Sequence, residues 1–203
     1  MSLFVVFEGI TGSGKKTQIK FLADKLAGRG KKIAIITFPD YEDPIARLTR
    51  SPDLDNHTVA LLHAADRAHQ QQRIKGLLES DNVVICDRYS YSNFAYQAAK
   101  GVDMNWLMNL EKKFLKPDFV FLVDVPVSVS MGRVQQLNIE DFTKKEIISR
   151  LQREKDFLEK IRENYLYLAK NNPDKETQWF VIDGTEDINK THEQIWSMVA
   201  PIV

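Results

Sequence analysis

The chain has 203 residues, of which 43% are hydrophobic and 28% charged, and its 28 Lys and Arg residues balance 28 Asp and Glu residues. This composition is typical of a soluble globular protein, and the length fits one domain with a sizeable core. The zero net charge argues against a broad basic surface for nucleic acid, and no apolar stretch approaches the roughly 20 residues of a membrane span.

Three further features limit the class of protein. No basic and apolar leader precedes the first predicted element, so we expect a cytoplasmic protein. Cys86 is the single cysteine and lies in an apolar run, which predicts a buried, unreactive thiol. No repeat, low-complexity tract or linker divides the chain, so we expect one domain over residues 1–203.

The first predicted element is a buried strand at residues 3–7, followed by a glycine-rich loop, a lysine and a helix. This is the P-loop arrangement, in which backbone N–H groups and the helix N-terminus bind phosphates and the lysine reaches the β- and γ-phosphates. The alternative, a glycine-rich turn that binds nothing, is disfavoured by the flanking strand and helix. The predicted ATP-binding residues are Gly9, Ile10, Thr11, Gly12, Ser13, Gly14, Lys15, Lys16 and Thr17.

Four more short apolar runs follow, at residues 33–37, 83–86, 119–123 and 179–182. They lack polar alternation, which predicts parallel strands buried on both faces. Helical stretches separate the runs, so the predicted class is α/β: a P-loop three-layer sandwich with a five-stranded parallel sheet flanked by helices. The predicted helices span residues 15–27, 57–78, 92–100, 104–114, 128–137, 144–170 and 189–200.

Polar residues stand where each predicted strand ends. Ligands of parallel α/β sheets bind outside the carboxyl ends of the strands, so we expect these side chains to converge on one edge of the sheet. They are Glu8, Asp40, Asp87, Arg88, Asp124 and Asp183.

The stretch after the third strand, residues 87–97, reads DRYSYSNFAYQ. As a bare pair, Asp87 and Arg88 are as consistent with a local salt bridge as with a ligand site. In the pattern D-R-Y-x-x-S-N-x-A-Y-Q, however, the stretch resembles the signature of thymidylate kinases. The resemblance extends over nearly the whole chain: FEG at residues 7–9, FP at 38–39, LLxxAxR at 61–67, KPD at 116–118, VDVP at 123–126 and VIDGT at 181–185.

The resemblance implies a homodimer that transfers the γ-phosphoryl group of ATP to the 5′-phosphate of dTMP, with Mg²⁺. The acceptor oxygen is already anionic and needs no general base, so catalysis rests on alignment and charge neutralisation. The implied catalytic residues are Lys15 on the donor phosphates, Arg88 on the acceptor phosphate and Asp87 on Mg²⁺ through water. A buried arginine at a sheet edge is costly without a bound anion, which favours this role for Arg88.

The resemblance also implies a substrate pocket in which Arg67 hydrogen-bonds the base, while Tyr96 and Gln97 shape the walls. Two other interpretations stay open: Arg67 as an ordinary salt-bridged helix residue, and Tyr96 as part of the core. The predicted substrate-binding residues are Phe38, His63, Arg67, Arg88, Ser92, Tyr96 and Gln97.

Two departures from the family pattern lie in the P-loop. Lys16 stands where the pattern has a Ser or Thr hydroxyl on Mg²⁺. Either Thr17 supplies this hydroxyl, or the metal is held by Asp87 and water. Thr11 stands where the family usually has an acidic residue that contacts the nucleotide sugar.

Two further departures concern the acceptor. His63 stands where an aromatic residue stacks on thymine; a histidine can stack but adds a titratable group. Asp40 and Tyr41 occupy the loop where an arginine normally grips the acceptor phosphate. Arg47 or Arg50 would substitute for it if the loop folds back.

A polar segment at about residues 134–148 is predicted to form a lid over the site. Residues 134–143 contain no arginine, although P-loops with glycine at position 12 usually go with lid arginines. The lid candidates are therefore Arg133, Arg150 and Arg153, and our hypothesis is that Arg150 or Arg153 closes on the γ-phosphate.

These departures leave two alternatives to a dTMP kinase. One is a kinase for another deoxypyrimidine monophosphate, dUMP or dCMP. The other is a catalytically weak nucleotide-binding regulator, which Lys16, Thr11 and the lid favour and which the intact P-loop and Asp87-Arg88 pair disfavour.

Overall fold

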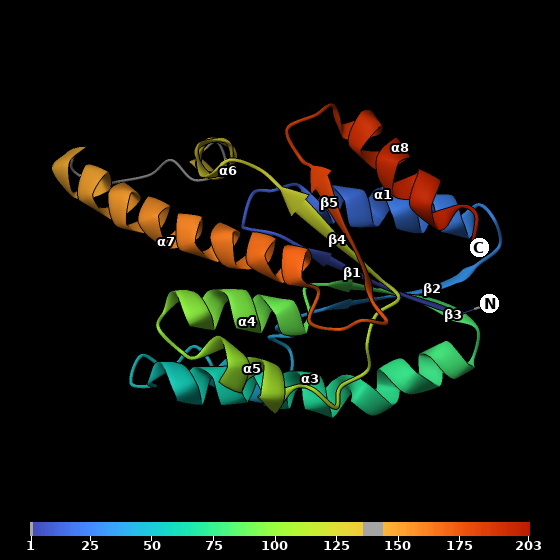
Figure 1. Cartoon of the computed structure of the whole chain (residues 1–203), viewed down its shortest axis with the longest axis horizontal. Helices are drawn as coiled ribbons and strands as arrows, with labels where there is room; N and C mark the ends of the chain where they lie inside the picture. Colours follow the sequence, from blue (N-terminus) through green and yellow to red (C-terminus); the bar gives the residue numbers. More distant parts are fainter. Residues whose placement is uncertain (1, 136–143) are drawn as a thin grey trace.

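The computed structural model describes the backbone of residues 2–135 and 144–203, with side chains described for residues 2–134 and 154–203. Its centre is a five-stranded sheet in the order β2-β3-β1-β4-β5, in which every pair of neighbours is parallel. The predicted α/β class is therefore confirmed (Figure 1). The strands are β1 (Leu3–Glu8), β2 (Lys32–Thr37), β3 (Asn82–Asp87), β4 (Phe119–Asp124) and β5 (Gln178–Asp183).

Helices cover both faces of the sheet, which gives the three predicted layers (Figure 1). On one face α1 and α8 pack with one apolar cluster, and on the other α3, α4 and α7 pack with a second. The helices are α1 (Lys15–Ala27), α2 (Pro44–Leu48), α3 (Asn56–Glu79), α4 (Ser90–Ala99), α5 (Met104–Leu110), α6 (Val127–Gln135), α7 (Lys144–Asn171) and α8 (Ile188–Val199).

The helix predictions missed one short helix and placed the end of another too late. Helix α2 was not predicted, because five residues are too few to show a helical period. Its start is fixed locally instead: the Asp43 carboxylate accepts the N–H of Ile45, and Pro44 occupies the first turn. Helix α5 ends at Leu110 rather than at residue 114, and Glu111 caps it.

The prediction that all five strands are buried on both faces was wrong for the two edge strands. Ile35 of β2 is 50% exposed and Val181 of β5 is 53% exposed, whereas β1 is buried throughout. The helices lie mainly over the middle of the sheet, so the outer strands keep exposed side chains. The prediction for Cys86 was right: its side chain is fully buried in β3, and burial raises the pKa of the thiol.

Strand order decides where the polar strand ends meet. Because β1 lies between β3 and β4, the carboxyl ends of these three strands place Glu8 beside Asp87 and the residues that follow them. This is the sheet edge at which ligands of open α/β sheets bind. Among the described helices, none combines the length and the apolar character needed to cross a membrane.

Candidate active site

The glycine-rich loop joins β1 to α1 in a conformation that its glycines require. Gly9 has φ 140°, and a Cβ there would lie 2.4 Å from the carbonyl oxygen of Val123. Gly14, with φ 103°, precedes the first turn of α1. The loop therefore passes close to β4 and presents the N-terminus of α1 at the sheet edge, as the sequence predicts.

Lys15 is buried against this loop. Its Nζ donates hydrogen bonds to the carbonyl oxygens of Gly9 (2.8 Å) and Ile10 (3.0 Å) and to the hydroxyl of Ser13 (3.4 Å). Burial, followed by the charge of Arg88, lowers the pKa of Lys15 to about 7. The ammonium group is thus held inside the loop, in an environment that penalises its charge until an anion is nearby.

Beside the loop lies a cavity of about 240 Å³, here called the Arg133 cavity. Arg133 of α6 closes one side: its guanidinium donates to the carbonyl oxygens of Gly12, Ser13 and Gly184 at 3.3, 3.3 and 2.8 Å. The lining residues are Ser13, Gly14, Thr17, Gln18, Val123, Arg133, Gly184, Glu186, Ile188 and Thr191. Of the three predicted lid arginines this one is placed at the loop, whereas the Arg150 and Arg153 side chains lie outside the described residues.

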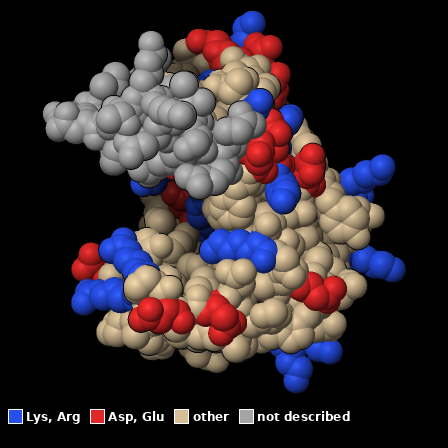
Figure 2. Space-filling view, turned by 90° about the vertical axis from the view of Figure 1, so that its left-hand side faces the viewer, with Lys and Arg blue, Asp and Glu red and all other residues tan. Residues whose placement is uncertain are grey.

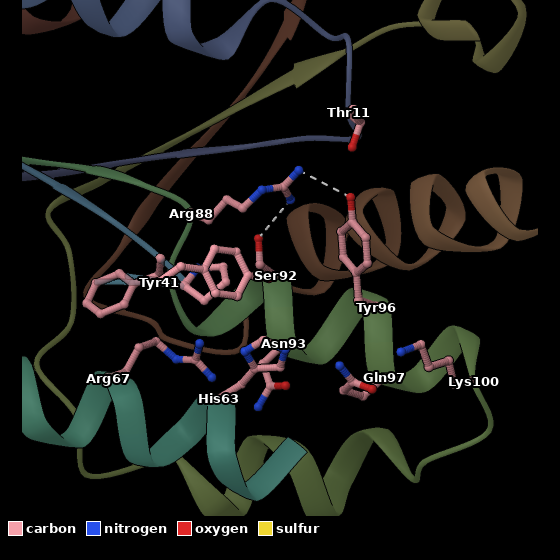
Figure 3. Close-up of a pocket in the computed structure, with 12 residues that line it drawn as sticks. Thr11, Tyr41, His63, Arg67, Arg88, Ser92, Asn93, Tyr96, Gln97 and Lys100 are labelled. Carbon is pink, nitrogen blue, oxygen red and sulfur yellow. Dashed lines mark hydrogen bonds between the residues drawn. The ribbon is translucent and has the colours of Figure 1, made fainter. Parts of the chain in front are cut away.

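On the other side of the loop lies a cavity of about 260 Å³, here called the Arg88 cavity (Figure 3). It brings together all seven predicted substrate-binding residues, which come from the β2–α2 loop, α3 and α4 and the end of β3. Its lining residues are Thr11, Phe38, Pro39, Tyr41, His63, Arg67, Arg88, Ser92, Asn93, Tyr96, Gln97 and Lys100. Their predicted role in binding stays a prediction.

Arg88 has an unusual environment in this cavity. Its backbone is left-handed, with φ 71°, and its guanidinium donates to the hydroxyls of Ser92, Tyr165 and Tyr96, each at 3.2 Å. Figure 3 shows the group directed across the cavity towards Tyr96. Within residues 2–134 and 154–203, its hydrogen-bond acceptors are these hydroxyls and no carboxylate. A half-buried cation with neutral partners is well placed to bind an anion.

Glu8, to which we assigned no role from the sequence, lies beneath Arg88. It is fully buried and accepts hydrogen bonds from the backbone N–H groups of Tyr89 (2.8 Å) and Ser92 (3.1 Å) and from the hydroxyls of Ser92 (2.6 Å) and Tyr165 (2.9 Å). Burial raises the pKa of this carboxyl, against the opposing effect of its hydrogen bonds and of Arg88. A charged residue at the end of a buried strand was the available sequence signal.

Arg67 forms a buried ion pair and also lines the cavity. It donates through Nε (2.7 Å) and Nη2 (2.5 Å) to the carboxylate of Glu111, and both side chains are at most 3% exposed. The two interpretations of Arg67, ligand contact and salt bridge, therefore do not exclude each other. The sequence gave no reason to single out Glu111, which lies 44 residues away.

Asn93 is a second residue that sequence reasoning missed, although it lies within the 87–97 motif. Its Nδ2 donates to Glu111 (2.8 Å) and to the carbonyl oxygen of Ala60 (3.1 Å), and both partners can only accept. The amide orientation is therefore fixed, and Oδ1 is the end without a partner among the described residues. One carboxylate, Glu111, thus orients both Arg67 and Asn93 in the cavity wall.

Of the two predicted metal ligands, Thr17 lines the Arg133 cavity, and Asp87 is buried at the end of β3. One oxygen of Asp87, Oδ1, has no hydrogen-bond partner in the described part of the chain. The described residues hold no cluster of three or more His, Cys, Asp or Glu side chains that could bind a metal ion by themselves. A metal at this edge would therefore take most of its ligands from a bound nucleotide and water.

Comparison with known proteins agrees with the signature in residues 87–97. The family model described as thymidylate kinase matches residues 7–195. The chain belongs to the thymidylate kinase family. A relative named "Probable thymidylate kinase" from Thermococcus kodakarensis is 38% identical over 99% of this chain and 98% of its own length. Relatives of the same name from Methanocaldococcus jannaschii and Pyrococcus horikoshii are 37% and 36% identical, covering 96% and 97% of this chain and 94% and 95% of their own.

As a member of the thymidylate kinase family the chain is an enzyme, and the structure locates its departures from the family pattern. Thr11 and His63 both line the Arg88 cavity. Burial and the nearby charges of Arg67 and Lys100 lower the pKa of His63 to about 3, so this ring is neutral at physiological pH. Lys16 is exposed at the start of α1. The neutral His63 ring therefore brings polarity to the Arg88 cavity but no positive charge.

The loop with Asp40 and Tyr41 carries two arginines near the cavity. The Arg47 guanidinium donates to the carbonyl oxygen of Tyr41 (2.8 Å), and that of Arg50 lies 3.7 Å from the centre of the Tyr41 ring. Tyr41 lines the Arg88 cavity, whereas neither arginine does. The proposed substitution of one of them for the family's loop arginine stays a hypothesis.

The positive charge of the site lies in the wall of the Arg88 cavity. On the face shown in Figure 2, basic and acidic side chains are interspersed among uncharged ones. Arg67 is buried and Arg88 is half-buried, so their positive charge is directed at a bound molecule rather than spread over the surface.

Proposed function

We propose that the protein transfers the γ-phosphoryl group of ATP to the 5′-phosphate of dTMP, giving dTDP and ADP. The observation that carries this proposal is Arg88, a cation held by three hydroxyls on the wall of a cavity beside the P-loop. Such a guanidinium suits a phosphate, which it can bind through two parallel hydrogen bonds. Membership of the thymidylate kinase family supports the same acceptor.

The base-binding part of the proposal rests on Arg67 and Asn93. Since Glu111 occupies Nε and Nη2 of Arg67, Nη1 is left as a donor, and Asn93 offers Oδ1 as an acceptor. Thymine and uracil present the complementary pair, a C4 carbonyl oxygen and an N3–H group, whereas cytosine presents an amino group and an unprotonated N3. This pattern favours dTMP or dUMP over dCMP. The neutral His63 ring would stack on the base, and Phe38, Tyr96, Gln97 and Ser92 complete the pocket.

On the donor side, the P-loop residues 9–17 would bind the phosphates of ATP, and the Arg133 cavity would take the nucleoside. Lys15 would move from its loop carbonyls to the β- and γ-phosphates. Mg²⁺ fits the buried Oδ1 of Asp87, which has no hydrogen-bond partner in the described part of the chain, with the Thr17 hydroxyl as a second candidate ligand. When bound, the ion neutralises charge on the β- and γ-phosphates. Lys15 and Arg88 hold donor and acceptor in line, and no protein base is required.

Four further expectations belong to this proposal. The protein would act in the cytoplasm, as one domain over residues 1–203 with a lid at about 134–148. Arg150 or Arg153 would close on the γ-phosphate. The protein would also form a homodimer, which sedimentation equilibrium measures directly.

A panel of acceptors tests the function. ADP release is measured with ATP, Mg²⁺ and either dTMP, dUMP, dCMP, dAMP or dGMP. We expect the highest kcat/KM with dTMP, a value about 10-fold lower with dUMP, which lacks one methyl group, and one on the order of 10²–10³-fold lower with dCMP. Preference for dCMP would contradict the assigned base contacts. No turnover with any acceptor, together with measurable ATP binding, would favour the nucleotide-binding regulator instead.

Lys15 gives a second test, through proton uptake. In the free protein its pKa is about 7, so at pH 8 the amine is mostly neutral. Bound phosphates favour the charged form and raise the pKa towards its ordinary value, so ATP binding should take up about 0.9 proton at pH 8 and less at lower pH. Titration calorimetry in buffers of different ionisation enthalpy measures this number. The variant Lys15→Arg stays charged and should take up none; equal uptake by both proteins would exclude Lys15 as the source.

A further inference from the structure

We propose that Glu8 is a positioning residue: its carboxylate sets the direction of the hydrogen bonds that hold Arg88 ready for the acceptor phosphate. This inference rests on the proposed function, because it takes the anion at Arg88 to be the phosphate of the nucleotide acceptor. Glu8 itself lies beneath Arg88 and does not line either cavity described above.

The backbone contacts of Glu8 fix the chain around Arg88. One carboxylate oxygen, Oε1, accepts the N–H groups of both Tyr89 and Ser92, the latter in the first turn of α4. Between β3 and these two residues, Arg88 adopts φ 71°, a left-handed conformation that is unfavourable for a residue with a long side chain. Glu8 therefore stabilises a strained backbone at the point from which the guanidinium enters the cavity.

The other oxygen, Oε2, fixes the direction of the side-chain hydrogen bonds. It accepts from the hydroxyls of Ser92 (2.6 Å) and Tyr165 (2.9 Å), and these same two hydroxyl oxygens accept from Nη1 of Arg88 (both 3.2 Å). A hydroxyl carries one hydrogen, and an ionised carboxylate can only accept. Hydrogens directed at Glu8 leave the oxygen lone pairs free for Arg88.

This arrangement determines which donors of Arg88 are left for a ligand. Nη1 is used by Ser92 and Tyr165, and one hydrogen of Nη2 by Tyr96. Of the five N–H groups of a guanidinium, Nε–H and the second Nη2–H remain without an acceptor among the described residues. Because the hydrogen-bond partners of Arg88 are neutral hydroxyls, its positive charge stays available to a phosphate. The negative charge of Glu8, on the other side of these hydroxyls, offsets part of it.

The variant Glu8→Gln tests this directly, since it keeps the shape of the side chain. The amide oxygen can still accept the two backbone N–H groups, but the amide nitrogen donates to the hydroxyls of Ser92 and Tyr165. The two hydroxyls lie 2.8 Å apart, so one can donate to the other, but the remaining hydrogen then turns towards Arg88 and opposes its donors. We expect the Kd of dTMP to rise by about 10- to 100-fold and kcat to fall by at least as much. The Kd of thymidine, which has no phosphate, and the KM of ATP should not change.

A double-mutant comparison adds a readout that a merely structural role would not move. Tyr165→Phe alone removes an acceptor of Arg88 and should weaken dTMP binding. In the Glu8→Gln background, the same change removes a misdirected hydrogen, so it should cause no further loss or a partial recovery. The single variant Tyr165→Phe, which leaves the carboxyl intact at a residue that does not line the Arg88 cavity, serves if Glu8→Gln does not fold. It should weaken dTMP binding and leave thymidine binding unchanged.

Three results would overturn the proposal. If Glu8→Gln had the same kinetics as the wild-type protein, the negative charge of Glu8 would not be needed to position Arg88. An equal loss of dTMP and thymidine binding in Glu8→Gln, or unchanged dTMP binding in Tyr165→Phe, would show that Glu8 only maintains the fold. A failure of the proposed function would be seen separately, in the wild-type protein. That protein would then bind dTMP and thymidine with equal affinity, or would not turn over dTMP.

Discussion

Replacing Arg88 by Ala is expected to lower kcat for dTMP phosphorylation by about 10³- to 10⁵-fold, the effect of removing an arginine that stabilises a phosphoryl-transfer transition state. Two phosphates repel each other as they approach, and Arg88 is a cation of the acceptor cavity whose guanidinium is held by hydroxyls alone among the described residues. Steady-state turnover with dTMP, at saturating ATP and Mg²⁺, measures the loss. Thermal unfolding should show a folded protein, because no carboxylate within residues 2–134 and 154–203 loses a direct hydrogen bond to Arg88.

Two matched variants separate the geometry of Arg88 from its charge. Arg88→Lys keeps the charge but loses the paired donors, so we expect partial activity at most. Arg73→Ala removes a positive charge from α3, where Arg73 is exposed and its guanidinium donates to Gln70, and should leave kcat unchanged. Activity of Arg88→Ala within about 10-fold of wild type would remove Arg88 from the mechanism.

The sequence predicted the elements and the local motif well because both depend on neighbouring residues. The P-loop needs its glycines within a few positions of Lys15, and the helix that follows was placed at the observed residues, Lys15–Ala27. The five strands were found because β-branched and aromatic residues cluster in each. Strand order, however, is decided by packing between elements, and without it the exposed sides of β2 and β5 could not be predicted.

The pairings that organise the site were missed for the same reason, although Glu8 itself was expected at this edge of the sheet. Glu8 bonds Tyr165, which lies 157 positions away, and Glu111 bonds Arg67 across 44 positions. A single sequence shows that an arginine or a glutamate is present, but the pairing is created by the fold. The ligand-facing candidates were found through a motif, whereas the contacts of the carboxylates that position them are set by the fold.

The second large effect is a loss of stability, which we expect when Glu111 is substituted. Its carboxylate is fully buried and is shared by Arg67 and Asn93. Glu111→Ala leaves the Arg67 guanidinium buried without a counter-charge, and breaking such a pair typically costs about 3–5 kcal/mol. For a chain of this size the melting temperature should fall by about 6–20 °C. Denaturant unfolding measures the free energy directly; a loss below about 1 kcal/mol would mean that Arg67 finds another partner or reaches water.

The double variant Glu111→Leu with Arg67→Met separates stability from substrate recognition. Replacing a buried ion pair by apolar side chains of similar size is often neutral or stabilising, so most of the lost stability should return. The preference for dTMP over dCMP should not return, because the Arg67 donor is gone and Asn93 has lost one of the acceptors that orient its amide. A stable double variant that still rejects dCMP would show that the base is read elsewhere in the cavity, with His63 and Gln97 as the next residues to test.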